Sequence, residues 1–94
     1  MATLSDDEVT AGLQRLPGWQ RQGDAITKEF ELPTFMDAIG FVNRVAERAE
    51  AANHHPDLDI RYRKVRATLS THDEGGITAK DLDLAGTIEA AAQS

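Results

Sequence analysis

The feature that most constrains this chain is a long amphipathic segment at residues 35–51, in the middle of the sequence. Its apolar residues recur at intervals of three and four, so they fall on one face of a helix. These residues are Phe35, Ala38, Ile39, Val42, Val45, Ala46 and Ala49. Thr34, with Asp37 three positions later, matches the start of a capped helix. The pattern predicts a central helix whose apolar face belongs to the core.

Two pairs of alternating segments flank this helix. Before it, residues 19–21 and 25–32 read as a hairpin around Gly23-Asp24, with Lys28 as an exception on the apolar side. After it, Leu58, Ile60 and Tyr62 alternate with polar residues, as do Val65, Ala67 and Leu69. We expect these segments to form a second hairpin whose turn is Arg63-Lys64, although this pair lacks the usual chemistry of a two-residue turn.

The two ends of the chain predict further helices. Ser5 with Glu8, and Thr78 with Asp81, have the spacing of capping boxes ahead of apolar periodic residues. The predicted order is therefore α-β-β-α-β-β-α in a single domain over residues 1–94. This order predicts an α+β fold, in which a four-stranded antiparallel sheet carries its helices on one face.

Composition excludes several classes of function. The formal net charge of −6 argues against nucleic acid as a direct partner, and the absence of cysteine excludes disulfides and thiolate chemistry. No glycine-rich phosphate loop and no membrane-spanning stretch occurs. The acidic N-terminal segment does not look like a signal peptide. We expect a cytoplasmic protein that requires no cofactor.

All three histidines of the chain lie in two short segments. His54 and His55 follow the central helix, and His72 lies at or just past the end of the last strand. They could simply end these elements, or they could carry out proton chemistry, because histidine titrates near neutral pH. Adjacent histidines on non-helical backbone should diverge, so a metal site would also need His72 and a carboxylate such as Asp57 or Asp73. We expect no bound metal.

Acid–base chemistry needs only two titratable groups on opposite sides of a small substrate. His54 and His72 would meet this requirement if both lay at the same edge of the sheet. Adding or removing water is a reaction that suits such a small chain. All three histidines are expected at the ends of elements, so each replacement by alanine should cost about 1 kcal/mol or less.

The residues around the histidines match a known family. The matching segments are residues 50–56 (EAANHHP), Tyr62, residues 69–73 (LSTHD), residues 76–78 (GIT) and Asp81-Leu82. Together they resemble pterin-4a-carbinolamine dehydratase, also called 4a-hydroxytetrahydrobiopterin dehydratase, over residues 35–88. The element order agrees across nearly the whole chain.

The resemblance implies loss of water from 4a-hydroxytetrahydropterin to give quinonoid dihydropterin. It implies that His54 and His72 are the acid–base groups, and that His55 completes the catalytic set mainly by holding the pterin. The implied substrate-binding residues are Glu50, Pro56, Ser70, Thr71 and Asp81. For Asp81, the capping of a helix is the competing interpretation.

The resemblance leaves alternatives open. Many relatives have aspartate where this chain has Asn53, so a possible charge partner for an imidazole is missing. Many have an aromatic residue where this chain has Leu58, so a surface on which the pterin could stack is missing or is supplied elsewhere. Some relatives are oligomeric partners of transcription factors, which makes a non-catalytic binding module the competing function. A role in molybdenum-cofactor pterin metabolism is a further alternative. We expect a homodimer or homotetramer, because the sheet has exposed edges.

Overall fold

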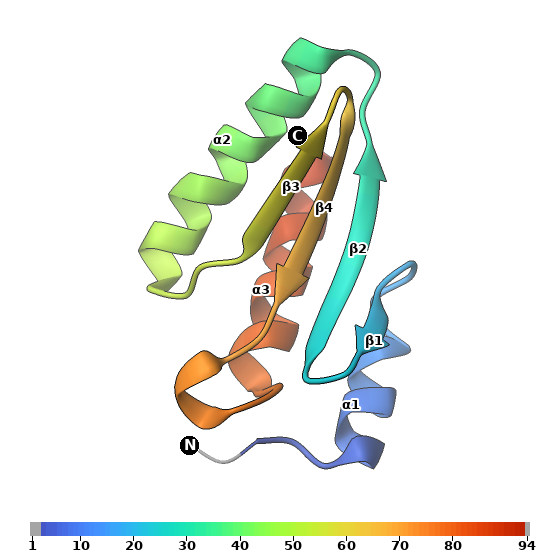
Figure 1. The fold of residues 1–94 in the computed structure, drawn as a ribbon, viewed down its shortest axis with the longest axis vertical. Coiled ribbons are helices and arrows are strands. Elements are labelled where there is room, and N and C mark those ends of the chain that lie inside the picture. Colours follow the sequence, from blue (N-terminus) through green and yellow to red (C-terminus); the bar gives the residue numbers. More distant parts are fainter. Residues whose placement is uncertain (1–2, 94) are drawn as a thin grey trace.

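The computed structural model describes residues 3–93. Within them the elements follow the order α-β-β-α-β-β-α, as predicted (Figure 1). They are α1 (Asp6–Leu13), β1 (Gln20–Gln22), β2 (Ala25–Glu31), α2 (Phe35–Ala52), β3 (Asp57–Arg61), β4 (Lys64–Leu69) and α3 (Ala79–Ala92), with a short 3₁₀ turn η1 (His72–Glu74) after β4. No helix within residues 3–93 is both long and apolar enough to cross a bilayer.

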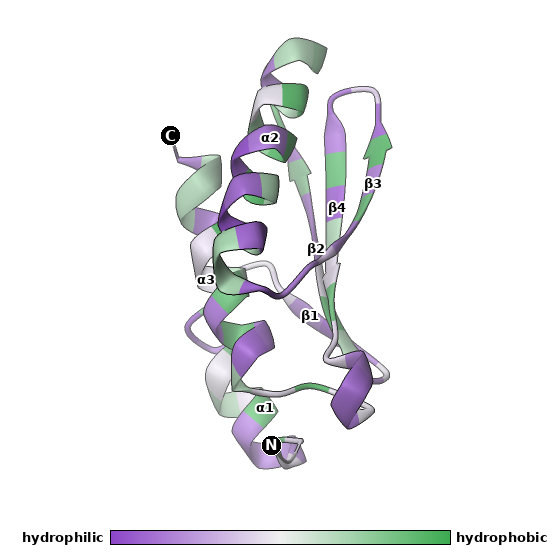
Figure 2. Ribbon diagram, turned by 90° about the vertical axis from the view of Figure 1, so that its left-hand side faces the viewer, coloured by the Kyte–Doolittle hydropathy of each residue, from purple (hydrophilic) through white to green (hydrophobic). Residues whose placement is uncertain are grey.

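The four strands form one antiparallel sheet in the order β1-β2-β4-β3. Figure 2 shows the helices on one side of this sheet, which confirms the predicted α+β fold. The core lies between the two layers, where alternate residues of β2 and β4 face the apolar side of α2. Fully buried side chains of this core include Ile26, Val65, Leu69, Phe41 and Val45.

The turn of the second hairpin was predicted one residue too late. Arg61 pairs with Lys64, so the loop consists of Tyr62 and Arg63 and not of Arg63 and Lys64. Both registers keep the apolar residues on one face, so alternation alone could not separate them. Contacts with distant residues accompany the observed register. Arg63 accepts a backbone hydrogen bond from Leu32 N–H at 2.9 Å, and its guanidinium donates to the Leu32 carbonyl at 3.1 Å.

The same register places Tyr62 outside its predicted strand. Its backbone is left-handed (φ 54°), its side chain is exposed, and its ring stacks on Phe35 with centroids 6.5 Å apart. A left-handed backbone is uncommon for a bulky residue. The ring contact joins the turn of the β3–β4 hairpin to the start of α2.

Lys28, the exception in the alternation of β2, has charged and polar partners on the helical side of the sheet. Its ammonium donates to the Pro17 carbonyl at 2.9 Å and forms an ion pair with Glu89 of α3. It also lies 4.8 Å from the centre of the Phe30 ring, within the range of a cation–π contact. Trp19 Nε1–H donates to the same Glu89 carboxylate at 3.0 Å. This cluster ties the segment before β1 to the last turns of α3.

The capping box of α1 is formed as predicted. Ser5 N–H donates to Glu8 Oε1 at 2.8 Å, and Glu8 N–H donates to Ser5 Oγ at 3.1 Å. The bond from Ser5 N–H holds the pKa of Glu8 below its ordinary value, because it stabilises the ionised carboxylate. In α2, Thr34 Oγ1 accepts from Asp37 N–H at 3.0 Å.

The end of α2 directs the chain towards the histidines. Asn53 adopts the left-handed conformation (φ 52°), and its N–H still donates to carbonyls of the last helical turn. Asparagine tolerates this conformation better than most residues. The next residue, His54, donates its backbone N–H to the Ala49 carbonyl at 3.1 Å. Asn53 is therefore the point where the helix stops and the histidine segment leaves it.

Candidate active site

Two loops and the start of α3 enclose a hollow of about 290 Å³. The loops are the one from α2 to β3 and the one after β4, so the hollow lies beside the end of β4. Only residues with polar side chains line it, namely Asn53, His54, His55, Ser70, Thr71, His72, Asp73 and Lys80. The structure therefore brings together all three histidines, from two segments that are separate in the sequence.

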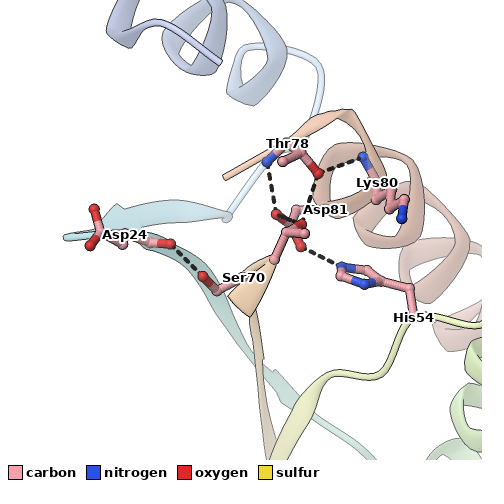
Figure 3. A network of polar contacts seen from close by, with 7 residues as sticks. Asp24, His54, Ser70, Thr78, Lys80 and Asp81 are labelled. Carbon is pink, nitrogen blue, oxygen red and sulfur yellow. Dashed lines mark hydrogen bonds and ion pairs between the residues drawn. The ribbon is translucent and has the colours of Figure 1, made fainter. Parts of the chain in front are cut away.

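His54 is the most enclosed of the three histidines and contacts a buried carboxylate. Its Nε2 lies 2.6 Å from Asp81 Oδ1, with 13% of the His54 side chain and none of the Asp81 side chain exposed. Asp81 Oδ2 accepts from Thr78 N–H at 2.9 Å and from Thr71 Oγ1 at 2.8 Å. Figure 3 shows Asp81 between Thr78 and His54. Three segments of the chain thus meet at one carboxylate.

This arrangement confirms one of the two interpretations of Asp81, the helix cap. The capping box of α3 is formed, because Asp81 accepts from the N–H of the N-cap residue Thr78. The same side chain also contacts His54, so the cap and a contact with a predicted site residue coexist. Since Asp81 is fully buried and is not among the residues that line the hollow, it lies behind His54.

His55 has its own carboxylate partner on α2. Its Nε2 lies 2.5 Å from Glu50 Oε2, and both side chains are largely exposed. The two adjacent imidazoles therefore diverge, one towards α3 and one towards α2, as predicted for neighbours on non-helical backbone. Asp81 is the carboxylate partner of His54, and Glu50 is that of His55. Both imidazoles therefore have a charged partner, although this chain has Asn53 where many relatives have aspartate.

His72 lies in η1, directly after the loop that follows β4. Its side chain has no hydrogen-bond partner among residues 3–93. It borders the 290 Å³ hollow and also a second hollow of about 320 Å³, whose walls include Asp24, Asp57 and Thr68. Ser70 borders both hollows as well, and its Oγ donates to the Asp24 carbonyl at 2.7 Å. The two hollows therefore adjoin at one end of the strands.

The other predicted site residues differ in how close they lie to the hollow. Thr71 lines the hollow, but its hydroxyl is bonded to Asp81 and its backbone N–H donates to the Gly76 carbonyl at 2.9 Å. Glu50 reaches the site only through His55, and Pro56 does not line the hollow. Leu58 packs against the core.

Lys80 also lines the hollow but was not predicted as a site residue, and Asp73, which lines it too, was considered only as a possible metal ligand. Each adjoins a predicted residue, Lys80 next to Asp81 and Asp73 next to His72. The pattern of the sequence could have indicated Lys80, because the first turn of a helix that starts at the site faces the same space. Among residues 3–93, no three histidine, aspartate or glutamate side chains are grouped closely enough to hold a metal ion.

Fold and site together define a class of protein. It is a small α+β domain that presents three imidazoles, two of them paired with carboxylates, to one polar hollow. Such an arrangement can donate and accept protons on a small polar ligand.

The chain belongs to the pterin 4 alpha carbinolamine dehydratase family, whose family model matches residues 2–91. Relatives in Roseiflexus sp. (strain RS-1) and Mycobacteroides abscessus each carry the name "Putative pterin-4-alpha-carbinolamine dehydratase". The first is 59% identical over 90 residues and the second 54% identical over 89 residues. The alignments cover 95% of this chain in both cases, and 97% and 95% of the two relatives.

Solved structures agree with this assignment. A crystal structure described as a transcriptional coactivator/pterin dehydratase from Brucella melitensis superposes with a TM-score of 0.92 at 37% identity, covering 96% of this chain and 98% of that chain. A pterin dehydratase-like protein described as a RuBisCO assembly factor in the alpha-carboxysome has a TM-score of 0.70 at 22% identity, covering 82% and 92%. At that identity the second likeness concerns the fold alone.

Proposed function

We propose that this chain is a hydro-lyase that releases water from 4a-hydroxytetrahydropterin and forms quinonoid dihydropterin. The observation that carries the proposal is the meeting of three histidines at one polar hollow in a member of this family. The volume of about 290 Å³ is just below the usual range for ligand pockets, about 300–1,000 Å³. A polar lining suits a heterocycle whose edge carries hydrogen-bond donors and acceptors.

The reaction moves two protons and exchanges no electrons with a carrier. The C4a–O bond breaks, and the leaving hydroxyl takes a proton from an imidazolium and departs as water. The N5–H bond breaks, a neutral imidazole takes that proton, and the remaining electron pair forms the N5=C4a double bond. His54 and His72 are the proposed pair, because they reach the hollow from its two opposing loops.

Substrate binding is proposed for the remaining polar groups of the hollow. His55, held by Glu50, would contact the ring from the α2 side. Ser70 and the backbone beside it would contact the amide edge, whereas Thr71 supports Asp81 from behind. The pterin itself is the only small-molecule partner in this proposal. The proposal also includes a cytoplasmic location, as expected from the sequence.

Steady-state kinetics on 4a-hydroxytetrahydropterin, generated in situ and followed by ultraviolet absorbance, test this function. We expect His54→Ala and His72→Ala each to lower kcat by at least about 100-fold, the usual contribution of a general acid or base. His55→Ala should mainly raise KM. The double variant should lose less than the product of the two single losses.

Glu47→Gln, on the exposed side of α2, serves as the control and should keep the parent's kinetics. Circular dichroism shows whether each variant is folded. A folded His54→Ala, His72→Ala double variant with the parent's turnover would refute acid–base catalysis by these residues.

A non-catalytic coactivator module is the second candidate. It is favoured by the Brucella melitensis structure, whose description includes a transcriptional coactivator. The large apolar side chains exposed near the β3–β4 turn, Phe35, Met36, Ile60 and Tyr62, offer a surface for such contacts. Parent protein without dehydratase activity would support this candidate. Activity on a different pterin would instead support the role in molybdenum-cofactor metabolism.

A further inference from the structure

The inference concerns Asp81 and the ring nitrogen of His54 that exchanges protons. Asp81 is fully buried at the first turn of α3, and each of its oxygens has a different task. Oδ2 accepts from Thr78 N–H and from the Thr71 hydroxyl, while Oδ1 lies 2.6 Å from His54 Nε2. An oxygen that receives two donors is typical of an ionised carboxylate, which can only accept.

The contact at Oδ1 determines the tautomer of His54. Because the carboxylate accepts, Nε2 must carry the hydrogen of the neutral ring, and the lone pair is then on Nδ1. Nδ1 has no hydrogen-bond partner among residues 3–93. Within the same residues, no buried side-chain nitrogen or oxygen lacks a partner, so Nδ1 is not buried. His54 borders this hollow as well as a smaller one of about 180 Å³, and we take the exposed Nδ1 to be the ring nitrogen that a ligand in the larger hollow would meet.

We infer that Asp81 is a positioning residue that holds His54 with its proton on Nε2, so that Nδ1 is the atom that exchanges protons with the substrate. This inference rests on the proposed function for its role in turnover, but the tautomer itself does not. When Nδ1 takes a proton, the ring becomes an imidazolium beside a carboxylate at 2.6 Å, which stabilises the charged ring.

Helix capping alone does not explain Asp81, and α1 provides the comparison within the same chain. The capping box of α1 uses Glu8, an exposed residue whose Oε1 accepts from Ser5 N–H. Capping of α3 likewise needs only Asp81 Oδ2. The burial of Asp81 and the second contact through Oδ1 are additional to the cap.

Replacing Asp81 by asparagine should reverse the tautomer without removing the cap. The backbone N–H of Thr78 is a fixed donor at the Oδ2 position, so the amide oxygen must stay there. The amide nitrogen then occupies the Oδ1 position and donates to His54 Nε2. Nε2 must now accept, so the neutral ring carries its hydrogen on Nδ1 and has no lone pair facing the hollow.

The test is nitrogen NMR of the three imidazoles at alkaline pH, where neutral rings are populated, combined with kinetics. In the parent we expect His54 with a protonated Nε2 and an unprotonated Nδ1. In Asp81→Asn these states should be exchanged while the His55 and His72 signals are unchanged. We expect kcat to fall by about 100-fold or more, as for other acid–base histidines held in the wrong tautomer, with little change in KM.

Glu8→Gln is the matched control, because it changes the acid of the other capping box and should alter neither the tautomers nor kcat. Parent protein with its hydrogen on His54 Nδ1 would overturn the inference, even if Asp81→Asn did not fold. A reversed tautomer with unchanged kcat would overturn the role of Nδ1 in turnover. Failure of the proposed function is separate, since it would appear as a parent protein without dehydratase activity, whereas NMR reports the tautomer whether or not the protein is active.

Discussion

Replacing His54 by alanine should destabilise the fold more than the same replacement of either other histidine. Asp81 has no exposed side-chain surface, and His54 Nε2 is the donor to its Oδ1. Removing one partner of a buried polar group costs about 1–3 kcal/mol, because the remaining group loses its hydrogen bond without regaining water. The expectation of about 1 kcal/mol or less, drawn from positions at the ends of elements, therefore no longer applies to His54.

The replacements of His55 and His72 by alanine should cost less stability than that of His54. The side chains of His55 and Glu50 are 56% and 77% exposed, and exposed ion pairs contribute about 0.2–1 kcal/mol. His72 is exposed and has no hydrogen-bond partner among residues 3–93, so its replacement should stay within about 0.5 kcal/mol. The expected order of destabilisation is His54, then His55, then His72.

Thermal and denaturant unfolding followed by circular dichroism measure this order. A domain of this size loses about 4–8 °C in Tm for each kcal/mol, so His54→Ala should lower Tm by several degrees or more. His54→Gln is the matched variant, because its side-chain amide can still donate to Asp81. It should recover part of the lost stability but not the lost activity. Equal Tm values for His54→Ala and His72→Ala would refute the argument that the Asp81 contact stabilises the fold.

Three further predictions follow from the structure. We expect a dimer or tetramer by light scattering, because β1 and β3 are sheet edges and Ile60 and Tyr62 are exposed; a monomer mass at micromolar concentration would contradict this. Exhaustive chelation should leave turnover unchanged, and a loss reversed only by added metal would disprove the acid–base assignment. Glu8→Gln should reduce stability at neutral pH relative to the parent. The folded-state pKa of Glu8 lies below its ordinary value of 4.5, so the charged cap contributes above that value and is lost as pH falls through the lowered pKa. The difference in Tm should therefore vanish in acid, and a difference that persists there would show that charge is not its cause.

The sequence by itself determined the order of the elements and most of the residues that they bury, although Phe35 and Ala46 of the predicted apolar face are exposed. Alternation in residues 25–32 and the spacing of three and four in residues 35–51 leave one apolar face each. A sheet and a helix with one apolar face must cover each other, so the α+β arrangement follows from local pattern. The convergence of His54 and His72 was predictable for the same reason, since they follow elements, α2 and β4, whose ends lie at the same end of the sheet.

Only the tertiary structure decided the turn of the second hairpin and the second contact of Asp81, because local sequence patterns were compatible with more than one outcome. Both possible turns of the second hairpin preserve alternation, and the observed one is accompanied by contacts of Arg63 with Leu32, which lies 31 residues away. Asp81 looks like a helix cap in the sequence, because its partner Thr78 is three residues away. Its contact with His54 spans 27 residues and exists only because α3 starts where the α2–β3 loop passes. Periodicity records which face is buried, but it carries no information about which polar groups from distant segments meet at that face.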